Sequence, residues 1–72
     1  MNATATITVV LDGTPRELPE GTTLAVLVAE LGHAPGAVGT AVNGRFVARA
    51  QRDEHRLASG DAVLFFQAIV GG

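Results

Sequence analysis

The alternation of apolar and polar positions predicts short strands at the start of the chain. Residues 4–11 are rich in β-branched side chains, and Asp12-Gly13 follows them directly. An Asp-Gly pair between two extended segments favours a tight hairpin, because both turn positions tolerate a positive φ angle. We therefore expect residues 16–18 to form a short return strand that ends at Pro19.

A change of period after this hairpin predicts one helix. Four apolar residues share one helical face because they follow one another at the spacing i, i+3, i+4 and i+7. The hydroxyl of Thr22 or Thr23 can cap the first turn, and Gly32 and Pro35 end the helix. We assign the four apolar residues to the core: Leu24, Leu27, Val28 and Leu31.

Small and polar residues fill most of the next part of the chain. Residues 34–39 are small and indicate a loop. Short extended segments at residues 41–43 and 45–47 surround an Asn43-Gly44 turn, which again favours a hairpin. Residues 48–57 are polar and charged, with no clean period, and they predict an irregular or partly helical connection over the surface.

The last strand is the most apolar part of the chain and is expected over residues 62–70. The order is then strand, strand, helix, strand, short strand, strand. One helix cannot cover both faces of a four- or five-stranded sheet, so it packs across one face of a mixed sheet. This α+β arrangement is a β-grasp, whose last strand lies centrally beside the first. We expect one domain over residues 1–72, with residues 69–72 as a flexible tail.

Composition excludes several classes of function. The chain has 72 residues, no cysteine, no lysine and a formal net charge of −2. Without cysteine it can form neither a disulfide nor a thiolate zinc site. No basic stripe exists and the three aromatic residues are all Phe, which argues against nucleic-acid binding. The apolar runs are far shorter than the ~20 residues of a spanning helix, so we expect a cytoplasmic protein that is a monomer when alone.

No side-chain pattern indicates catalysis or metal binding. His33 and His55 lie apart in predicted loops, and no spacing of His, Glu or Cys is typical of a metal site. Asp53 and Glu54 are adjacent, which on most backbones turns their side chains away from each other. We therefore expect no catalytic side chain, no metal and no bound cofactor.

The two C-terminal glycines are the remaining candidate for chemistry. Gly71 and Gly72 lack a Cβ atom, so they can enter a narrow tunnel and bring a backbone carboxylate to another protein's reactive centre. A terminal carboxylate is ionised at neutral pH and is then a poor electrophile. It must be activated before it can react, for instance as an acyl-phosphate anhydride that a partner makes from ATP.

Four segments match one known family in order and position: Pro19-Glu20-Gly21-Thr22-Thr23-Leu24, Val42-Asn43-Gly44-x-x-Val47-x-Arg49, Gly60-Asp61 and Phe66-Gln67-Ala68-Ile69-Val70-Gly71-Gly72. The chain resembles the ThiS family, the sulfur carriers of bacterial thiamine biosynthesis. A Gly-Gly end is shared with ubiquitin and its relatives, whereas Phe66-Gln67-x-Ile69 before it is more specific. Ala48 stands where the family often has proline, and the residues after Arg49 are unusually charged.

The resemblance implies a ubiquitin-like fold and a protein substrate rather than an enzyme. In the family an adenylating enzyme related to ubiquitin-activating enzymes uses ATP to activate the terminal carboxylate, here that of Gly72. Sulfur from a persulfide carrier then displaces AMP, and the resulting thiocarboxylate supplies sulfur to a thiazole synthase. By the same resemblance, Ile69, Val70 and Gly71 thread into the partners' active sites.

The final strand is also expected to dock these partners. Alternate residues of a strand face opposite sides of the sheet. By similarity to ubiquitin-like proteins, Val63 and Phe65 face the helix-covered core. Leu64, Phe66 and Ala68 then form an apolar docking surface on the open face. The alternative is that both faces are covered and no such surface exists.

Other functions stay open at this point. The small subunit of molybdopterin synthase is another Gly-Gly-ended sulfur carrier on this fold, although its family tends to have prolines where this chain has Gln67-Ala68-Ile69. A carrier that serves cysteine or another sulfur-containing product is a third possibility. Two further alternatives are a protein modifier that is joined to lysines of target proteins, and a β-grasp interaction module whose terminus is inert.

Overall fold

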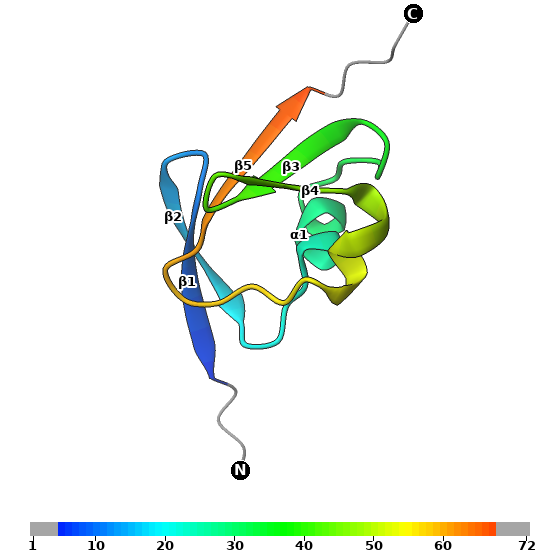
Figure 1. The fold of residues 1–72 in the computed structure, drawn as a ribbon. Coiled ribbons are helices and arrows are strands. Elements are labelled where there is room, and N and C mark those ends of the chain that lie inside the picture. Colours follow the sequence, from blue (N-terminus) through cyan, green and yellow to red (C-terminus); the bar gives the residue numbers. More distant parts are fainter. Residues whose placement is uncertain (1–4, 68–72) are drawn as a thin grey trace, which may run out of the picture.

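The computed structural model describes residues 5–67, which form one mixed sheet with a helix against one face (Figure 1). In chain order the elements are β1 (Thr6–Leu11), β2 (Thr14–Pro19), α1 (Leu24–Glu30), β3 (Val38–Val42), β4 (Arg45–Val47), the 3-10 helix η1 (Arg49–Glu54) and β5 (Ala62–Gln67). The strands lie in the order β2-β1-β5-β3-β4. β1 and β5 run parallel at the centre, and the other neighbours are antiparallel. The predicted β-grasp is confirmed.

Both tight turns form at the Asp-Gly and Asn-Gly pairs, as predicted. Asp12 and Gly13 have φ angles of 50° and 85°, and Asn43 and Gly44 have 53° and 82°. Positive φ at both turn residues is typical of a type I′ hairpin, whose twist matches that of its strands. Pairing therefore starts directly after the first turn, and β2 is longer than the expected residues 16–18.

The helix starts where the sequence indicates. The Thr23 hydroxyl accepts a hydrogen bond from the Val26 N–H at 3.3 Å, which satisfies one of the free donors of the first turn. Past the end of α1, Gly32 adopts a φ of 83°. Of the four apolar residues assigned to the core, three are buried and Leu31, beyond the last helical residue, is partly buried. The buried three are Leu24, Leu27 and Val28.

The core lies between α1 and the two central strands. Val9 of β1 and Val63 of β5 are fully buried, and Leu27 of α1 is fully buried in the same cluster. Phe65 is partly buried and packs against this cluster. The predicted inward direction of Val63 and Phe65 is confirmed, so the other face of β5 is the open one.

β3 begins earlier than expected. Val38 pairs with Gln67 and Gly39 pairs with Phe66, so the prediction of a loop over residues 34–39 was wrong at its last two positions. Residues 34–39 show no alternation of apolar and polar side chains that would predict a strand. Residues 38 and 39 are extended because they pair with β5. Residues 68–70 of the expected last strand and the expected tail lie outside the described residues.

The connection after β4 contains η1, and one of its arginines is buried. Arg52 is only 4% exposed. Its Nε donates to Thr40 Oγ1 at 3.0 Å, its Nη1 to the Pro35 carbonyl at 2.9 Å and its Nη2 to the Val38 carbonyl at 2.7 Å. Burial, and secondly the nearby Arg49, lower the pKa of Arg52, although a guanidinium stays charged in proteins. The expectation of a purely surface connection was therefore wrong at Arg52.

Replacing Arg52 with alanine should lower the free energy of unfolding by about 2–4 kcal/mol, because it removes three hydrogen bonds, one of them to the buried Thr40 hydroxyl. Urea unfolding followed by far-UV circular dichroism measures this, since the chain has no Trp or Tyr. The exposed Arg45 is the matched control, and its replacement with alanine should change stability by no more than about 0.5 kcal/mol. Equal losses in the two variants would contradict the account.

Candidate functional site

The open face of β5 carries exposed apolar side chains. Leu64 is 50% exposed and Phe66 is 45% exposed. Both point away from the side of Phe65, which packs against the core. The structure therefore places Leu64 and Phe66 together on the face that the helix does not cover.

Phe46 of β4 extends this apolar area across the sheet. It is 67% exposed and pairs with Ala41 of β3, which in turn pairs with Leu64 of β5. Directly paired residues share a face of the sheet, and the Phe46 and Phe66 rings lie 6.3 Å apart, centroid to centroid. We call Phe46, Leu64 and Phe66 the apolar patch. Phe46 was not predicted as part of this surface, although alternation along residues 45–47 places it on the face opposite Val47.

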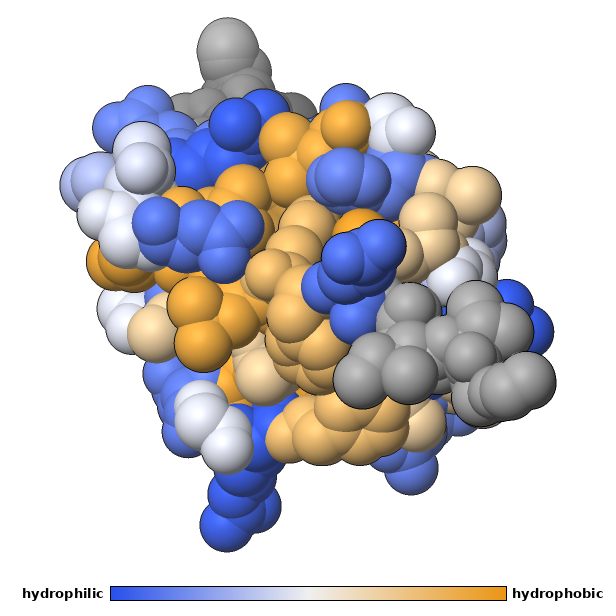
Figure 2. All heavy atoms as spheres, turned by 90° about the horizontal axis from the view of Figure 1, so that it is seen from above, coloured by the Kyte–Doolittle hydropathy of each residue, from blue (hydrophilic) through white to orange (hydrophobic). Residues whose placement is uncertain are grey.

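Figure 2 looks down on the end of the molecule where β5 finishes, and apolar side chains form a broad surface there. Patches of this kind, rimmed by polar residues, mark interaction sites on small proteins. The other large exposed apolar residue of the described part, Val26, lies on α1. The apolar patch is therefore a distinct feature of the sheet.

The Phe66 ring lies directly over the backbone of Gly39. A Cβ atom at residue 39 would overlap Cε2 of the ring and would lie 2.6 Å from Cζ and 2.7 Å from Cδ2. No side chain larger than hydrogen fits beneath the ring. Because Gly39 has no side chain, the Phe66 ring can lie against the β3 backbone, and the ring covers the part of β3 that would otherwise be exposed there.

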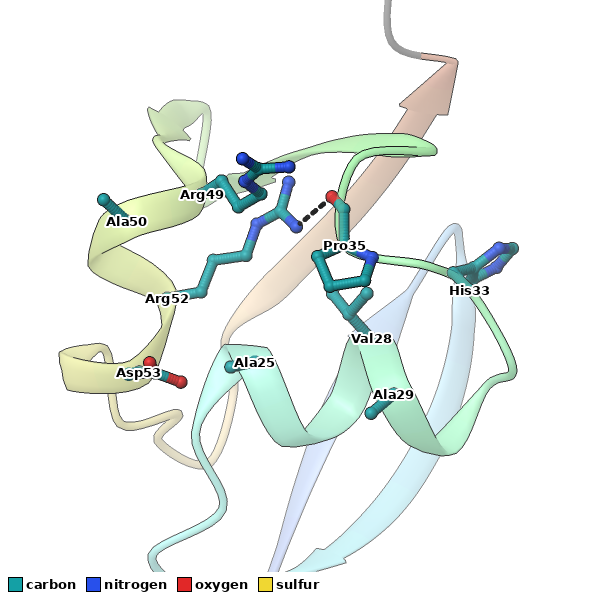
Figure 3. A pocket seen from close by; sticks show the side chains of 9 residues that line it. All are labelled: Ala25, Val28, Ala29, His33, Pro35, Arg49, Ala50, Arg52 and Asp53. Atoms are coloured by element: carbon teal, nitrogen blue, oxygen red, sulfur yellow. Dashed lines mark hydrogen bonds between the residues drawn. The ribbon is translucent and has the colours of Figure 1, made fainter.

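A hollow of about 350 Å³ adjoins the apolar patch on the side of η1. Arg52, which donates to the Pro35 carbonyl, and Arg49 beside it both line this hollow (Figure 3 shows the two arginines from the side of α1). A second hollow, of about 410 Å³, lies on the other side of the two arginines, between α1 and η1. The first hollow is lined by Pro35, Gly36, Val38, Gly39, Phe46, Arg49, Arg52 and Phe66.

The expected attachment and threading residues lie outside the described part of the chain. This applies to Gly72 as the site of adenylation and sulfur attachment, and to the tail residues expected to thread into partners. It applies also to Ala68, the third residue of the expected docking surface. The expected roles of these five residues stay predictions: Ala68, Ile69, Val70, Gly71 and Gly72.

The two histidines and the two adjacent carboxylates do not form a site. The His33 and Phe65 rings form an edge-to-face pair with 5.6 Å between centroids, whereas His55 follows η1 and donates its backbone N–H to the Arg52 carbonyl. Asp53 lines the hollow between α1 and η1, and Glu54 lines a different one. Within residues 5–67, no group of three or more His, Asp or Glu is placed to hold a metal ion.

The helices of the described part are also too short to cross a membrane: none of them combines the length and the apolar character that a span needs.

Comparisons with known proteins agree with this architecture. Residues 6–72 match the model of the ThiS family. The crystal structure of a thiamine biosynthesis protein (ThiS) from Geobacter metallireducens has a TM-score of 0.78 and 26% identity, and the match covers 92% of this chain and 100% of that one. A solution NMR structure of a thiamine biosynthesis protein from the same organism has a TM-score of 0.73 and 26% identity, over 92% and 88% of the two chains. No curated protein matches the sequence.

Replacing Gly39 with alanine should displace the Phe66 ring from β3 and destabilise the fold by about 1 kcal/mol or less, because the ring is 45% exposed and can turn outward. NMR contacts between the rings of Phe66 and Phe46 report the displacement directly. In a Phe66→Ala background the same Gly39→Ala change should cost much less, because the overlapping ring is gone. Ring contacts that survive the single substitution would contradict this prediction.

Proposed function

Because the chain belongs to the ThiS family, we propose that it is a sulfur-carrier protein of thiamine biosynthesis. The observation that carries this proposal is the family match, which extends from β1 through Gly72. Both similar solved structures are thiamine biosynthesis proteins, which favours the thiamine pathway over the molybdopterin alternative. The protein is then a substrate of its partner enzymes and not itself a catalyst.

The chemistry takes place at the C-terminal carboxylate of Gly72. A carboxylate oxygen attacks the α-phosphorus of ATP on an adenylating enzyme, and pyrophosphate leaves. The terminal sulfur of a persulfide then attacks the acyl carbon and AMP leaves. A thiol cleaves the sulfur–sulfur bond, which gives a disulfide and the free thiocarboxylate. This thiocarboxylate gives its sulfur to a thiazole synthase.

The composition of the chain supports the choice of the terminus. With no cysteine, no side chain can hold sulfur as a thiol or persulfide. Gly71 and Gly72 have no Cβ atom, so they fit a narrow active-site tunnel, and Ile69 and Val70 precede them in it. ATP is bound and consumed by the activating partner.

The apolar patch supports a role for the sheet in docking. Leu64 and Phe66 are half-exposed on β5, and Phe46 extends the same face. A partner that covers this patch gains the free energy of burying apolar surface. It also holds β5, whose continuation is the reactive tail. We propose that Leu64, Phe66 and Ala68, together with Phe46, form the docking surface for the adenylating enzyme and the thiazole synthase.

Incubation with the cognate adenylating enzyme, ATP and a persulfide donor should raise the intact mass by about 16 Da, the replacement of one terminal oxygen by sulfur. Mass spectrometry of the whole chain measures the change, and fragmentation locates it at Gly72. No change, under conditions in which a known carrier reacts with its own enzymes, would contradict the proposal. Adducts on lysines of other proteins, linked through Gly72, would favour the modifier alternative instead.

Removal of Gly71 and Gly72 provides the control for this experiment. The shortened chain should gain no sulfur, and its melting temperature should stay close to that of the full chain, because a terminal tail makes few contacts. A large fall in melting temperature would mean that the two glycines are structural.

Replacing Phe66 with arginine should keep the fold and weaken binding to the adenylating enzyme by about tenfold or more, since an exposed apolar contact is lost and a charge must be desolvated. Val26→Arg is a matched control, because Val26 is 46% exposed and lies on α1. Calorimetric titration measures both affinities, and circular dichroism checks both folds. Similar affinities for the two variants would contradict a docking role for the sheet face.

A further inference from the structure

Arg49 has no role in the proposed function, although it ends the segment Val42-Asn43-Gly44-x-x-Val47-x-Arg49 that resembles the family. It is the first residue of η1 and is exposed. Its guanidinium lies against the backbone of Gly36: a Cβ atom at residue 36 would be 3.1 Å from Nη1. The absence of a side chain at Gly36 therefore makes room for the Arg49 head group beside the hollow.

The charged residues that line this hollow are all positive, whereas Asp53 lines only the hollow between α1 and η1. The lining of the first hollow contains two arginines and no carboxylate. The three hydrogen bonds of Arg52 go to the Thr40 hydroxyl and to the carbonyls of Pro35 and Val38, all neutral acceptors. Arg49 further lowers the pKa of Arg52, as a nearby positive charge does. Because no carboxylate in the lining balances these two positive charges, the hollow attracts a negatively charged group from outside.

The walls of the hollow are held in place before anything binds. Arg52 joins η1 to the Pro35 carbonyl before β3 and to the Val38 carbonyl at its start, so the helix that carries Arg49 is tied to both. Phe66 lies on Gly39 and contacts the Phe46 ring. A prearranged surface loses less conformational entropy on binding than a mobile one. The apolar patch and the backbone that carries Arg49 are therefore held in place relative to each other.

We propose that Arg49 and the hollow beside Phe46 and Phe66 recognise an acidic side chain that lies next to an apolar side chain on the adenylating enzyme. The apolar side chain enters the hollow between the two Phe rings and Pro35. The carboxylate accepts hydrogen bonds from the Arg49 guanidinium, whose planar donors suit a carboxylate. This inference rests on the proposed function and names the chemistry by which the carrier is recognised.

A second copy of this chain is a poorer occupant. A two-fold dimer through the patch would use the same surface on both protomers, and each Arg49 would then face another positively charged hollow. Like charges across an interface oppose association. The charge pattern therefore favours a different, acidic partner.

Charge reversal tests this inference. Arg49→Glu should lower kcat/KM for adenylation by about tenfold or more, mainly through KM, because the carrier then presents a negative charge to a carboxylate. Arg16→Glu is the matched control, since it makes the same change of charge on β2, at the opposite edge of the sheet. It should change kcat/KM by no more than about twofold, as long-range charge effects are screened by salt.

A conservative variant separates charge from geometry. Arg49→Lys keeps the charge but loses the planar donors, so KM should rise less than in Arg49→Glu while kcat stays the same. The loss caused by Arg49→Glu should also shrink as ionic strength rises. Circular dichroism melting curves check that each variant folds.

The outcomes of the two proposals are distinct. If the wild-type chain is not adenylated at all, the proposed function fails. If the wild-type chain reacts normally and Arg49→Glu behaves like Arg16→Glu, only the inference about Arg49 is overturned. A wild-type dimer that sedimentation detects and that Arg49→Glu dissociates would also overturn it, since the occupant would then be a second copy.

Discussion

The guanidinium of Arg52 is the interaction on which the site depends most directly. It is buried, and it hydrogen-bonds Thr40, Pro35 and Val38 from η1. A charge taken out of water is costly unless hydrogen bonds satisfy it, and here neutral oxygens do so in three directions. The same bonds hold η1 against the start of β3. The fold thereby fixes the helix that carries Arg49 relative to the strand that supports Phe66.

Besides the Arg52 hydrogen bonds, two glycines help to position the side chains of the site. Gly39 lets the Phe66 ring lie on β3, and Gly36 leaves room for the Arg49 head group. β3 lies next to β5, and β5 in turn is paired in parallel with β1 at the centre of the sheet. Within the apolar patch, Leu64 and Phe66 therefore lie on the part of β5 that pairs with β3, and Phe46 lies on the edge strand β4.

Local sequence patterns predicted the elements that depend on local physics. The Asp12-Gly13 and Asn43-Gly44 turns, the Thr23 cap and the buried face of α1 each follow from a few neighbouring residues. The β-grasp order followed from layering. Strand alternation put Leu64 and Phe66 on one face, and only the similarity to ubiquitin-like proteins indicated that this face is the open one. Arg52 could not be predicted in this way, because its acceptors lie at residues 35, 38 and 40. Phe46 and the start of β3 were missed for the same reason: their surroundings come from pairing between distant segments.

The central claim is that the open sheet face and Arg49 together recognise the activating partner. NMR mapping of the side-chain signals, on mixing the carrier with its adenylating enzyme in the absence of ATP, tests it most directly. The account predicts changes at the Phe46 and Phe66 rings, the Leu64 methyl groups and the Arg49 Nε–H, with the Val26 methyl groups unchanged. Changes that gather around Val26 on α1 and leave the sheet face unaffected would contradict it.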